Sequence, residues 1–352
     1  MKKNFTTILL GLLVVAVMSS CVNSNKFNNN SNSESTAGLL YVINSGNPSF
    51  EDASLSIYDP KRKQVQNEAF AEANHADLGD MACSMTMYSS LGWIVVGGSD
   101  LIYAVDPASA RKKGVITGFA SPRQIHFVNS TKAYVTQQGD PRICVVDPGN
   151  YRIKDYISST AYSTEQMVQV GSYVYVTCWQ NQQKVLQIDT ATDKVVGELE
   201  VGLQPRWMVV DKNSKLWVLT DGGDKDGKNE EYPRLVKIDP KTFSIEQTFW
   251  MNDYEEPHSL SLNRYKDTLL WITGEGIWKM SVNDTQLPVL QHIENHRNSY
   301  TAMLVDYTSD EIYVADSPNG AINHTIYRYT FDGNKVDQFN VGRNPSALCF
   351  ER

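Results

Sequence analysis

The sequence predicts an all-β fold, a seven-bladed β-propeller built from four-stranded blades. One motif recurs seven times after Leu39 at a spacing of about 45 residues, which is the period of a propeller blade. Each repeat contains four strand-like runs, and the first and last repeats are incomplete in complementary ways. These observations favour a closed ring over the main alternative, two stacked β-sandwiches.

The recurring motif marks the third strand of each blade. Its strand-like run ends on an aliphatic or aromatic residue that is followed by Asp and by Pro or Thr, a combination that favours a turn. The five regular copies are IYDP (57–60), AVDP (104–107), VVDP (145–148), QIDT (187–190) and KIDP (237–240). Two degenerate copies follow, WKMSV (278–282) and YRYTF (327–331).

Three further strand types surround this motif, and we name the four strands A to D from the inside of the blade outward. The B strands are rich in Val, Ile, Tyr, Trp and Thr, and they begin at residues 39, 92, 132, 173, 215, 269 and 311. The A strands begin at residues 82, 121, 163, 204, 256, 299 and 344. The D strands follow the motif and begin at residues 63, 113, 151, 194, 243, 288 and 335.

The two ends of the chain predict how the ring closes. The propeller begins with a B strand at Leu39 and ends with a lone A strand, Asn344 to Phe350. The first blade therefore takes its inner strand from the C-terminus, and hydrogen bonds between the chain ends close the ring. We expect the propeller to span residues 39–352.

The N-terminus is typical of a lipoprotein signal peptide, which we assign to residues 1–20. Lys2 and Lys3 precede an apolar run from Ile8 to Met18, which is too short to span a membrane. Small residues then precede Cys21, as lipid attachment to that cysteine requires. The alternative is an ordinary secretory signal followed by an unmodified cysteine.

A flexible tether is expected between the lipid and the propeller. Residues 21–38 are rich in Asn and Ser and contain too few apolar side chains to bury a core. The whole chain carries 32 basic and 40 acidic residues, a net charge of −8. This balance argues against nucleic acid and against a polybasic membrane patch, so we expect membrane contact through the lipid anchor alone.

The sequence contains no recognisable catalytic or metal-binding motif, and we expect neither an enzyme nor a resident cofactor. The loop 221–227 resembles a calcium loop in composition but lacks its spaced ligands, so we interpret it as a solvated loop and expect no metal. Four cysteines remain after Cys21: Cys83, Cys144, Cys178 and Cys349. Cys144 and Cys178 fit buried strand positions, although an exported protein could join cysteines in disulfides.

The candidate ligand site lies where the D–A and B–C loops meet around the central channel. Alignment of the A strands brings one residue of each blade to this rim, and we call the set the collar. Its members are Cys83, Arg123, Glu165, Arg206, His258, Thr301 and Ser346. Arginine offers several donors for phosphate, carboxylate or amide groups, although a collar of ion pairs and water is an equally simple interpretation.

Aromatic residues near the same loops suggest a large, flat, amphipathic ligand. The candidates are Trp179, Trp207, Tyr232 and Tyr300, with Phe50 and Tyr254 nearby. Packing between blades is the alternative role for each of them, most of all for Trp207. Trp217, Trp271 and Trp278 lie inside strands and are assigned to the core.

Several segments resemble the YncE-like seven-bladed propellers, and in particular the DUF5074-type surface lipoproteins of Bacteroidetes. They are LGDMACSM (78–85), SPRQIHFVNSTKAYVT (121–136), STEQMVQVGSYVYVTCW (163–179), QPRWMVVDKNSKLWVLTDGG (204–223), IYVADS (312–317) and VGRNPSALCF (341–350). The resemblance implies a lipid-anchored protein on the outer surface of the outer membrane.

The best understood proteins of that group, the BtuG proteins, capture cobalamin and pass it to a TonB-dependent, BtuB-like outer-membrane transporter. The resemblance therefore implies that this chain captures a corrinoid such as vitamin B12. The alternatives are a surface propeller that binds another transported ligand or a glycan, and a propeller lyase or lactonase. An enzyme of the latter kind needs a metal or a placed acid and base, which the sequence does not reveal.

Overall fold

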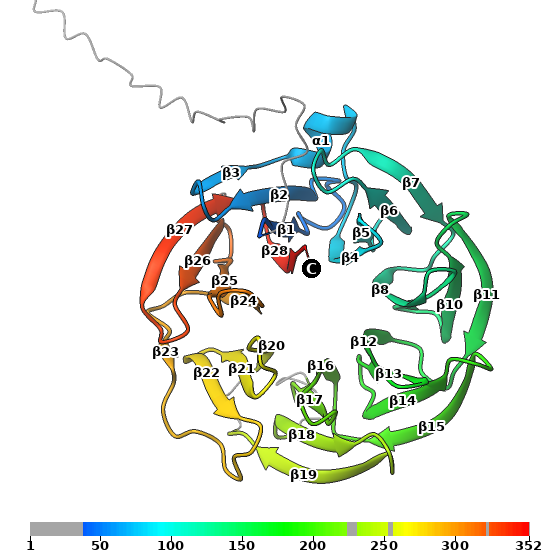
Figure 1. Ribbon diagram of the computed structural model, residues 1–352, viewed down its shortest axis with the longest axis vertical. Coiled ribbons are helices and arrows are strands. Elements are labelled where there is room, and N and C mark those ends of the chain that lie inside the picture. Colours follow the sequence, from blue (N-terminus) through cyan, green and yellow to red (C-terminus); the bar gives the residue numbers. More distant parts are fainter. Residues whose placement is uncertain (1–37, 224–230, 253–255, 322–323, 352) are drawn as a thin grey trace, which may run out of the picture.

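The computed structural model describes residues 38–223, 231–252, 256–321 and 324–351. Within these ranges the strands form seven four-stranded antiparallel sheets, arranged as blades around a central axis (Figure 1). The predicted seven-bladed propeller is therefore confirmed. The predicted signal peptide, Cys21 and the predicted tether up to residue 37 lie outside the described residues.

In blades two to seven the strands run in chain order from the innermost strand A to the outermost strand D. Blades two and three comprise β4 (Ala82–Tyr88), β5 (Leu91–Val96), β6 (Leu101–Val105), β7 (Lys112–Thr117), β8 (Pro122–Asn129), β9 (Lys132–Gln137), β10 (Arg142–Asp147) and β11 (Arg152–Ser158). Blades four and five comprise β12 (Thr164–Val170), β13 (Tyr173–Cys178), β14 (Lys184–Asp189), β15 (Lys194–Glu200), β16 (Pro205–Val210), β17 (Leu216–Thr220), β18 (Arg234–Asp239) and β19 (Ser244–Trp250). Blades six and seven comprise β20 (His258–Leu262), β21 (Thr268–Thr273), β22 (Gly276–Ser281), β23 (Ile293–Glu294), β24 (Tyr300–Val305), β25 (Ile312–Asp316), β26 (His324–Tyr329) and β27 (Lys335–Val341).

The first blade joins the two ends of the described chain. Its strands, from the inside outward, are β28 (Pro345–Phe350), β1 (Leu40–Asn44), β2 (Ser54–Asp59) and β3 (Gln64–Gln66). Strands β28 and β1 pair from Leu40 opposite Phe350 to Asn44 opposite Pro345, and Ser45 N–H donates to the Asn344 carbonyl at 2.9 Å. The predicted ring closure by the C-terminal strand is thus confirmed, and it leaves β1 paired on both sides, with β2 and β28.

The Asp of the recurring motif shapes the turn between strands C and D. Asp59 Oδ1 accepts a hydrogen bond from Lys61 N at 2.8 Å, Asp189 Oδ1 from Ala191 N at 2.7 Å, and Asp239 Oδ1 from Lys241 N at 2.9 Å. A short carboxylate side chain that accepts from the backbone two residues ahead stabilises a turn. The repeated acid therefore has a local structural role on the face opposite the candidate site.

One large aromatic side chain in each B strand packs between neighbouring blades. These residues are no more than 2% exposed: Tyr41, Trp93, Tyr134, Tyr175, Trp217, Trp271 and Tyr313. The Tyr41 hydroxyl donates to the Pro107 carbonyl at 3.2 Å, and the Tyr175 hydroxyl donates to the Pro240 carbonyl at 3.0 Å. Each of these bonds reaches the C–D turn of the next blade, so these two tyrosines link neighbouring blades.

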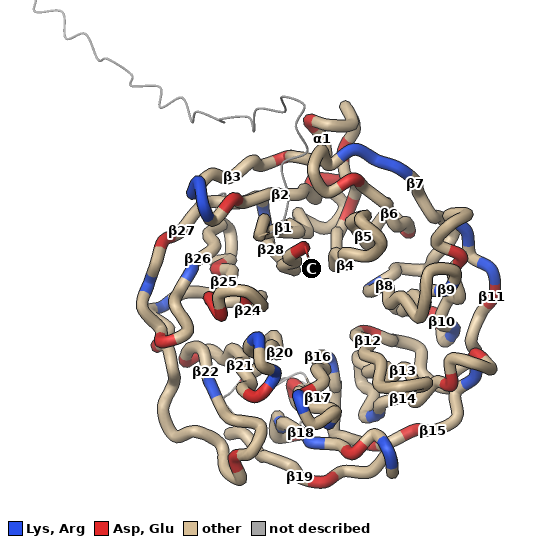
Figure 2. The backbone as a smooth tube through the Cα atoms, viewed as in Figure 1, with Lys and Arg blue, Asp and Glu red and all other residues tan. Residues whose placement is uncertain are grey.

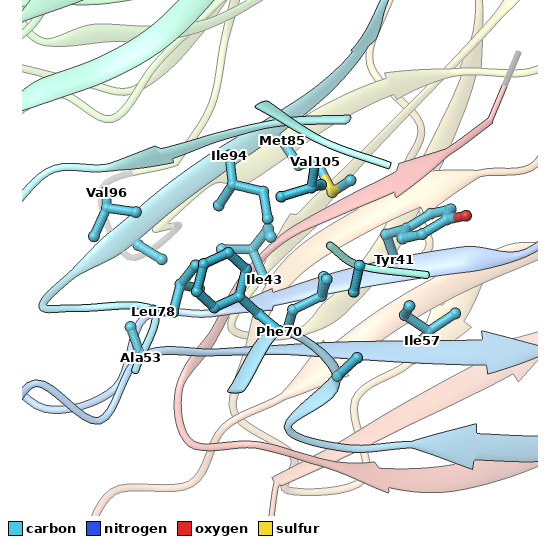
Figure 3. Close-up of a cluster of buried hydrophobic side chains, with 14 residues drawn as sticks. Tyr41, Ile43, Ala53, Ile57, Phe70, Leu78, Met85, Ile94, Val96 and Val105 are labelled. Atoms are coloured by element: carbon cyan, nitrogen blue, oxygen red, sulfur yellow. The ribbon is translucent and has the colours of Figure 1, made fainter. Parts of the chain in front are cut away.

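The apolar clusters lie between adjacent blades rather than in one central core. Figure 3 shows the cluster between blades one and two, where Tyr41, Ile43, Phe70, Met85 and Ile94 meet. Complete burial of side chains of this size stabilises the fold by roughly 1.5–3 kcal/mol each. The predicted core positions Trp217, Trp271 and Trp278 are also buried.

The outer edge of blade one differs from the prediction. The expected D strand stops at Gln66, and helix α1 (Ala69–Asn74) follows it. Glu68 adopts a left-handed backbone conformation with φ 55°, which ends the extended run. Ala69 and Phe70 are buried in the cluster of Figure 3, so tertiary packing of Phe70 favours the helix over a longer strand.

The outer strand of blade six is also shorter than predicted. The expected run from Pro288 to Ile293 contributes only the two-residue strand β23, whereas Val289 and Leu290 are 90% and 75% exposed. Pairing with β22 starts only at His292, whose N–H donates to the Ile277 carbonyl at 2.8 Å, and Pro288 itself has no N–H to contribute.

The cysteines of the described chain are all free thiols, so no disulfide joins Cys83, Cys144, Cys178 and Cys349 there. Cys144 and Cys178 are buried in strands β10 and β13 as predicted, and burial raises the pKa of both thiols to about 12.

Charged residues of both signs are distributed around the ring (Figure 2). In the described residues no helix is long and apolar enough to cross a membrane.

Candidate functional site

The candidate site lies on the face where the inner strands begin, which we call the D–A face. The antiparallel order of the strands brings both the D–A and the B–C loops to this face. The collar residues stand at or near the starts of β4, β8, β12, β16, β20, β24 and β28, close to the axis (Figure 1). The topology therefore gathers one collar residue from every blade, as predicted.

The backbone is irregular at the collar. In the pairing of strands A and B, the register shifts between Ala82 and Ser84 around Cys83, and between Pro205 and Trp207 around Arg206. Equivalent shifts occur in the other blades, although in blade six the shift follows His258 rather than enclosing it. A β-bulge leaves one residue outside the regular ladder and redirects its side chain, a device that is common beside binding sites.

Side-chain amides hold adjacent inner strands in place just behind the collar. Gln124 Oε1 accepts from Met167 N at 2.5 Å, and Gln166 Oε1 accepts from Met208 N at 2.5 Å. Each bond crosses from one blade to the next at the residue that follows a collar position. These contacts keep the strand starts of blades three, four and five at a fixed spacing.

Arg123 and Glu165 form an ion pair across blades three and four. Arg123 Nε donates to Glu165 Oε1 at 3.0 Å and to Oε2 at 3.2 Å, and the two side chains are only 16% and 8% exposed. Arg123 Nη1 also donates to Cys83 Sγ at 3.2 Å. Burial alone would lower the pKa of Arg123, but the carboxylate of Glu165 outweighs it and the pKa is raised. This part of the collar is therefore internally neutralised.

Arg206 has a different environment in blade five. Its guanidinium carbon lies 4.6 Å from the ring centre of Trp179 and 5.1 Å from that of Trp207, within the range of cation–π contacts. Among the described residues the guanidinium makes no hydrogen bond or ion pair, so its five N–H donors remain available.

Trp179 and His258 complete this group, which we call the indole cluster: Trp179, Arg206, Trp207 and His258. The Trp179 indole N–H donates to Asp221 Oδ2 at 3.0 Å, which orients the ring. The His258 ring meets Trp207 edge-on, with centroids 5.9 Å apart. Burial lowers the pKa of His258, and the positive charge of Arg206 lowers it further, so the imidazole is neutral at pH 7.

Two predicted aromatic residues lie outside the indole cluster. Tyr232 is on the B–C loop of blade five and is 52% exposed. Tyr300 lies within β24 and is only 6% exposed; its hydroxyl accepts from Asn298 Nδ2 at 3.0 Å and lies 3.3 Å from that of Tyr329. Tyr300 is thus a packing residue between strands rather than an exposed loop residue.

Asp221 is a site residue that the sequence analysis placed in a calcium-like loop and did not connect with Trp179. Its Oδ1 accepts from Gly223 N at 3.0 Å, while Oδ2 holds the indole. Residues 224–227 of that loop lie outside the described chain. Among the described residues, no three His, Cys, Asp or Glu side chains gather as a metal site.

Comparison with protein families identifies the chain. The profile of DUF5074, a domain of unknown function, matches residues 38–350. The chain belongs to the DUF5074 family. No curated protein sequence matches it.

Solved structures share the fold of this DUF5074 propeller at low sequence identity. A quinoprotein alcohol dehydrogenase-like protein of Bacteroides thetaiotaomicron matches with a TM-score of 0.68 and 16% identity, over 90% of this chain and 78% of that one. Hydrazine synthase of Kuenenia stuttgartiensis matches with a TM-score of 0.60 and 13% identity, over 76% and 88%. The computationally designed Ika8 protein matches with a TM-score of 0.61 and 9% identity, over 91% and 92%. These likenesses establish the fold alone.

Proposed function

We propose that this DUF5074 propeller captures a corrinoid on its D–A face, with the indole cluster as the centre of the site. The observation that carries the proposal is the guanidinium of Arg206 against the rings of Trp179 and Trp207, with no hydrogen bond or ion pair to any residue that the structure describes. A corrin is broad and apolar on its faces and carries carboxamides at its edge. Indole rings supply the apolar contact, and a guanidinium supplies several donors for amide oxygens.

The remaining parts of the proposal follow from the resemblance to the BtuG proteins. We propose that the chain is anchored by lipid at Cys21 on the outer surface of the outer membrane. It then hands the corrinoid to a TonB-dependent, BtuB-like transporter. A flexible tether between Cys21 and the propeller would let the D–A face reach such a partner.

We propose binding rather than catalysis. The collar contains one carboxylate, Glu165, and that group is occupied by Arg123. The imidazole of His258 contacts an indole edge, and burial together with Arg206 lowers its pKa despite the nearby carboxylate of Glu256, so it is neutral at pH 7. Cobalamin is accordingly a ligand in this proposal and not a resident cofactor.

Calorimetric titration of the propeller, residues 39–352, with cyanocobalamin tests the proposal. Wild type is expected to bind, and Arg206→Ala and Trp179→Ala should each lose about 2 kcal/mol, roughly thirtyfold in affinity. Lys113→Ala is the matched control because this exposed residue is the second of β7, beside the C–D turn on the opposite face. Absence of binding by wild type at micromolar protein contradicts corrinoid capture. If both site variants bind as tightly as wild type, the ligand site lies elsewhere on the protein.

Lipid attachment is tested separately in cells. Labelled palmitate should enter the wild-type chain, and Cys21→Ala should release the protein from membranes or leave an uncleaved precursor. Identical fractionation of the two proteins, without incorporation of label, would contradict the lipoprotein assignment.

A further inference from the structure

A second concavity lies on the D–A face, further from the axis than the collar. Its volume is about 430 Å³, within the range of small-molecule sites. The D–A loop 159–163 and the B–C loop 179–183 of blade four form its sides, and residues of the outer strand β15 complete it. Neither the collar nor the indole cluster lines this concavity.

The two loops that form the concavity are held by backbone hydrogen bonds. Gly139 N–H donates to the Tyr162 carbonyl at 2.9 Å, and Gln204 N–H donates to the Gln182 carbonyl at 2.7 Å. Gln180 and Asn181 both have positive φ, 45° and 58°, which is uncommon for two successive residues other than glycine. The concavity is therefore formed before any ligand arrives, and a ligand does not have to order these loops.

The charged residues on its wall are already satisfied. Lys184 Nζ donates to Glu198 Oε2 at 2.8 Å and to Thr160 Oγ1 at 2.7 Å, and Thr160 Oγ1 donates to Glu198 Oε1 at 2.6 Å. Hydrogen bonds from Lys184 and Thr160 lower the pKa of Glu198, which stays ionised as part of a neutral pair. The further carboxylate of Glu200 makes the lining net negative, so an anionic ligand is disfavoured.

The side-chain amides of the lining make no hydrogen bond to the residues that the structure describes. Gln182 is only 8% exposed, yet among the described residues its carboxamide has no hydrogen-bond partner. The carboxamides of Asn181 and Gln183 on the same loop likewise have none there, and both residues are exposed. The side-chain atoms of Gln182 are not among the buried polar atoms that lack a partner, so its carboxamide reaches solvent and its donors and acceptor are open to a ligand.

Tyr162 adds an exposed ring beside these amides. It is 55% exposed, although its backbone is fixed by Gly139. An exposed aromatic ring offers a flat apolar surface, and the neighbouring carboxamides offer both donors and acceptors.

We propose that this concavity binds a neutral saccharide. A sugar ring presents an apolar C–H face that can stack on Tyr162, and its hydroxyl groups can both donate to and accept from Asn181, Gln182 and Gln183. Its lack of charge avoids the repulsion that the net negative lining would exert on an anion. The inference does not depend on corrinoid capture, because none of these residues belongs to the indole cluster.

Saturation-transfer NMR on the propeller, residues 39–352, tests the inference. The probes are the methyl glycosides of glucose, galactose, mannose and N-acetylglucosamine. We expect at least one to bind with a Kd on the order of 1 mM, as is usual for one small polar ligand in an open site. Tyr162→Ala and Gln182→Ala should each weaken that binding about tenfold or more.

Two controls fix the location of the site. Tyr265→Ala removes a tyrosine of similar exposure, 62%, from an A–B turn on the opposite face, and it should leave glycoside binding unchanged. Arg206→Ala should also leave it unchanged, while impairing corrinoid binding. Absence of saturation transfer from every glycoside overturns the inference, and so does unchanged binding by Tyr162→Ala, whose exposed side chain the fold does not need.

Discussion

Two arginines hold equivalent positions in the collar, and their surroundings differ completely. Arg123 in blade three is bound to both oxygens of Glu165 and to the sulfur of Cys83. Arg206 in blade five contacts two indole rings and has no acidic partner among the described residues. A register shift in the inner strand positions both side chains, so the backbone does not explain the difference.

The residue contributed by the next blade explains it. Blade four places the carboxylate of Glu165 beside Arg123, whereas blade six places a neutral imidazole, His258, near Arg206. The indole N–H of Trp179 donates to Asp221, and the Trp179 ring packs against the guanidinium of Arg206. The Arg123 side of the collar is therefore a structural ion pair, whereas on the other side the guanidinium of Arg206 has no polar partner within the described part of the chain.

The largest effect is expected when the ion pair is broken. Glu165→Ala leaves the guanidinium of Arg123 buried without its counter-charge, and loss of one partner of a buried pair costs about 3–5 kcal/mol of unfolding free energy. Urea denaturation of wild type and variant measures the change.

The double variant Arg123→Leu/Glu165→Leu is the control for this prediction. It removes both charges together and should be closer to wild type in stability than Glu165→Ala, because no unpaired charge remains. Equal midpoints for wild type and Glu165→Ala would mean that the pair is not a structural element of the collar.

A smaller effect, on ligand affinity, is expected when lysine replaces arginine in the collar, because the positive charge is kept and the planar guanidinium is lost. Arg206→Lys loses the planar fork that stacks on Trp179 and Trp207, so cyanocobalamin affinity should fall about tenfold, or about 1.4 kcal/mol. Arg123→Lys should change the affinity by much less, because Arg123 is occupied by Glu165. Equal losses in calorimetric titrations of the two variants would remove the distinction between the halves of the collar.

The stability of the free protein should respond weakly to Arg206. Arg206→Ala removes contacts with two partly exposed indole rings, and such contacts contribute about 0.5–1 kcal/mol each. The urea midpoint should therefore shift much less than for Glu165→Ala. A shift as large as that of Glu165→Ala would indicate that Arg206 has a structural role like that of Arg123.

The sequence predicted the blades and the positions of the collar because both follow from a period along the chain. The spacing of the motif fixes which strands are innermost, and a residue at the start of each inner strand then reaches the rim. The departures lie at outer edges, where helix α1 depends on burial of Phe70 and β23 is shortened after Pro288. Such local departures are not encoded in a strand period.

The partners of the collar residues were harder to predict. Glu165 pairs with Arg123, and Asp221 with Trp179, across 42 residues in each case. Both bonds cross between blades and require side-chain positions that the alignment of strands does not supply. For Tyr300, the same alignment predicted proximity to the rim but did not reveal that its ring turns into the core.

The smallest expected effect is a pH dependence that originates in the Arg206 half of the collar. The pKa of His258 is lowered from its ordinary value of 6.5 by burial and by Arg206. At pH values between the pKa of His258 in the unfolded chain, 6.5, and its lower pKa in the native chain, the unfolded chain binds a proton that the native chain does not. The free energy of unfolding therefore falls as the pH drops through this range. His258→Gln should therefore reduce the loss of thermal stability between pH 7 and pH 5, measured by calorimetry as the change in Tm.

Arg206→Ala should reduce this loss of thermal stability partly, since removal of the positive charge lets the pKa of His258 rise, whereas the charged variant Arg206→Lys should not. Equal pH slopes for wild type and His258→Gln would show that other groups account for the acid sensitivity and that His258 is not coupled to Arg206.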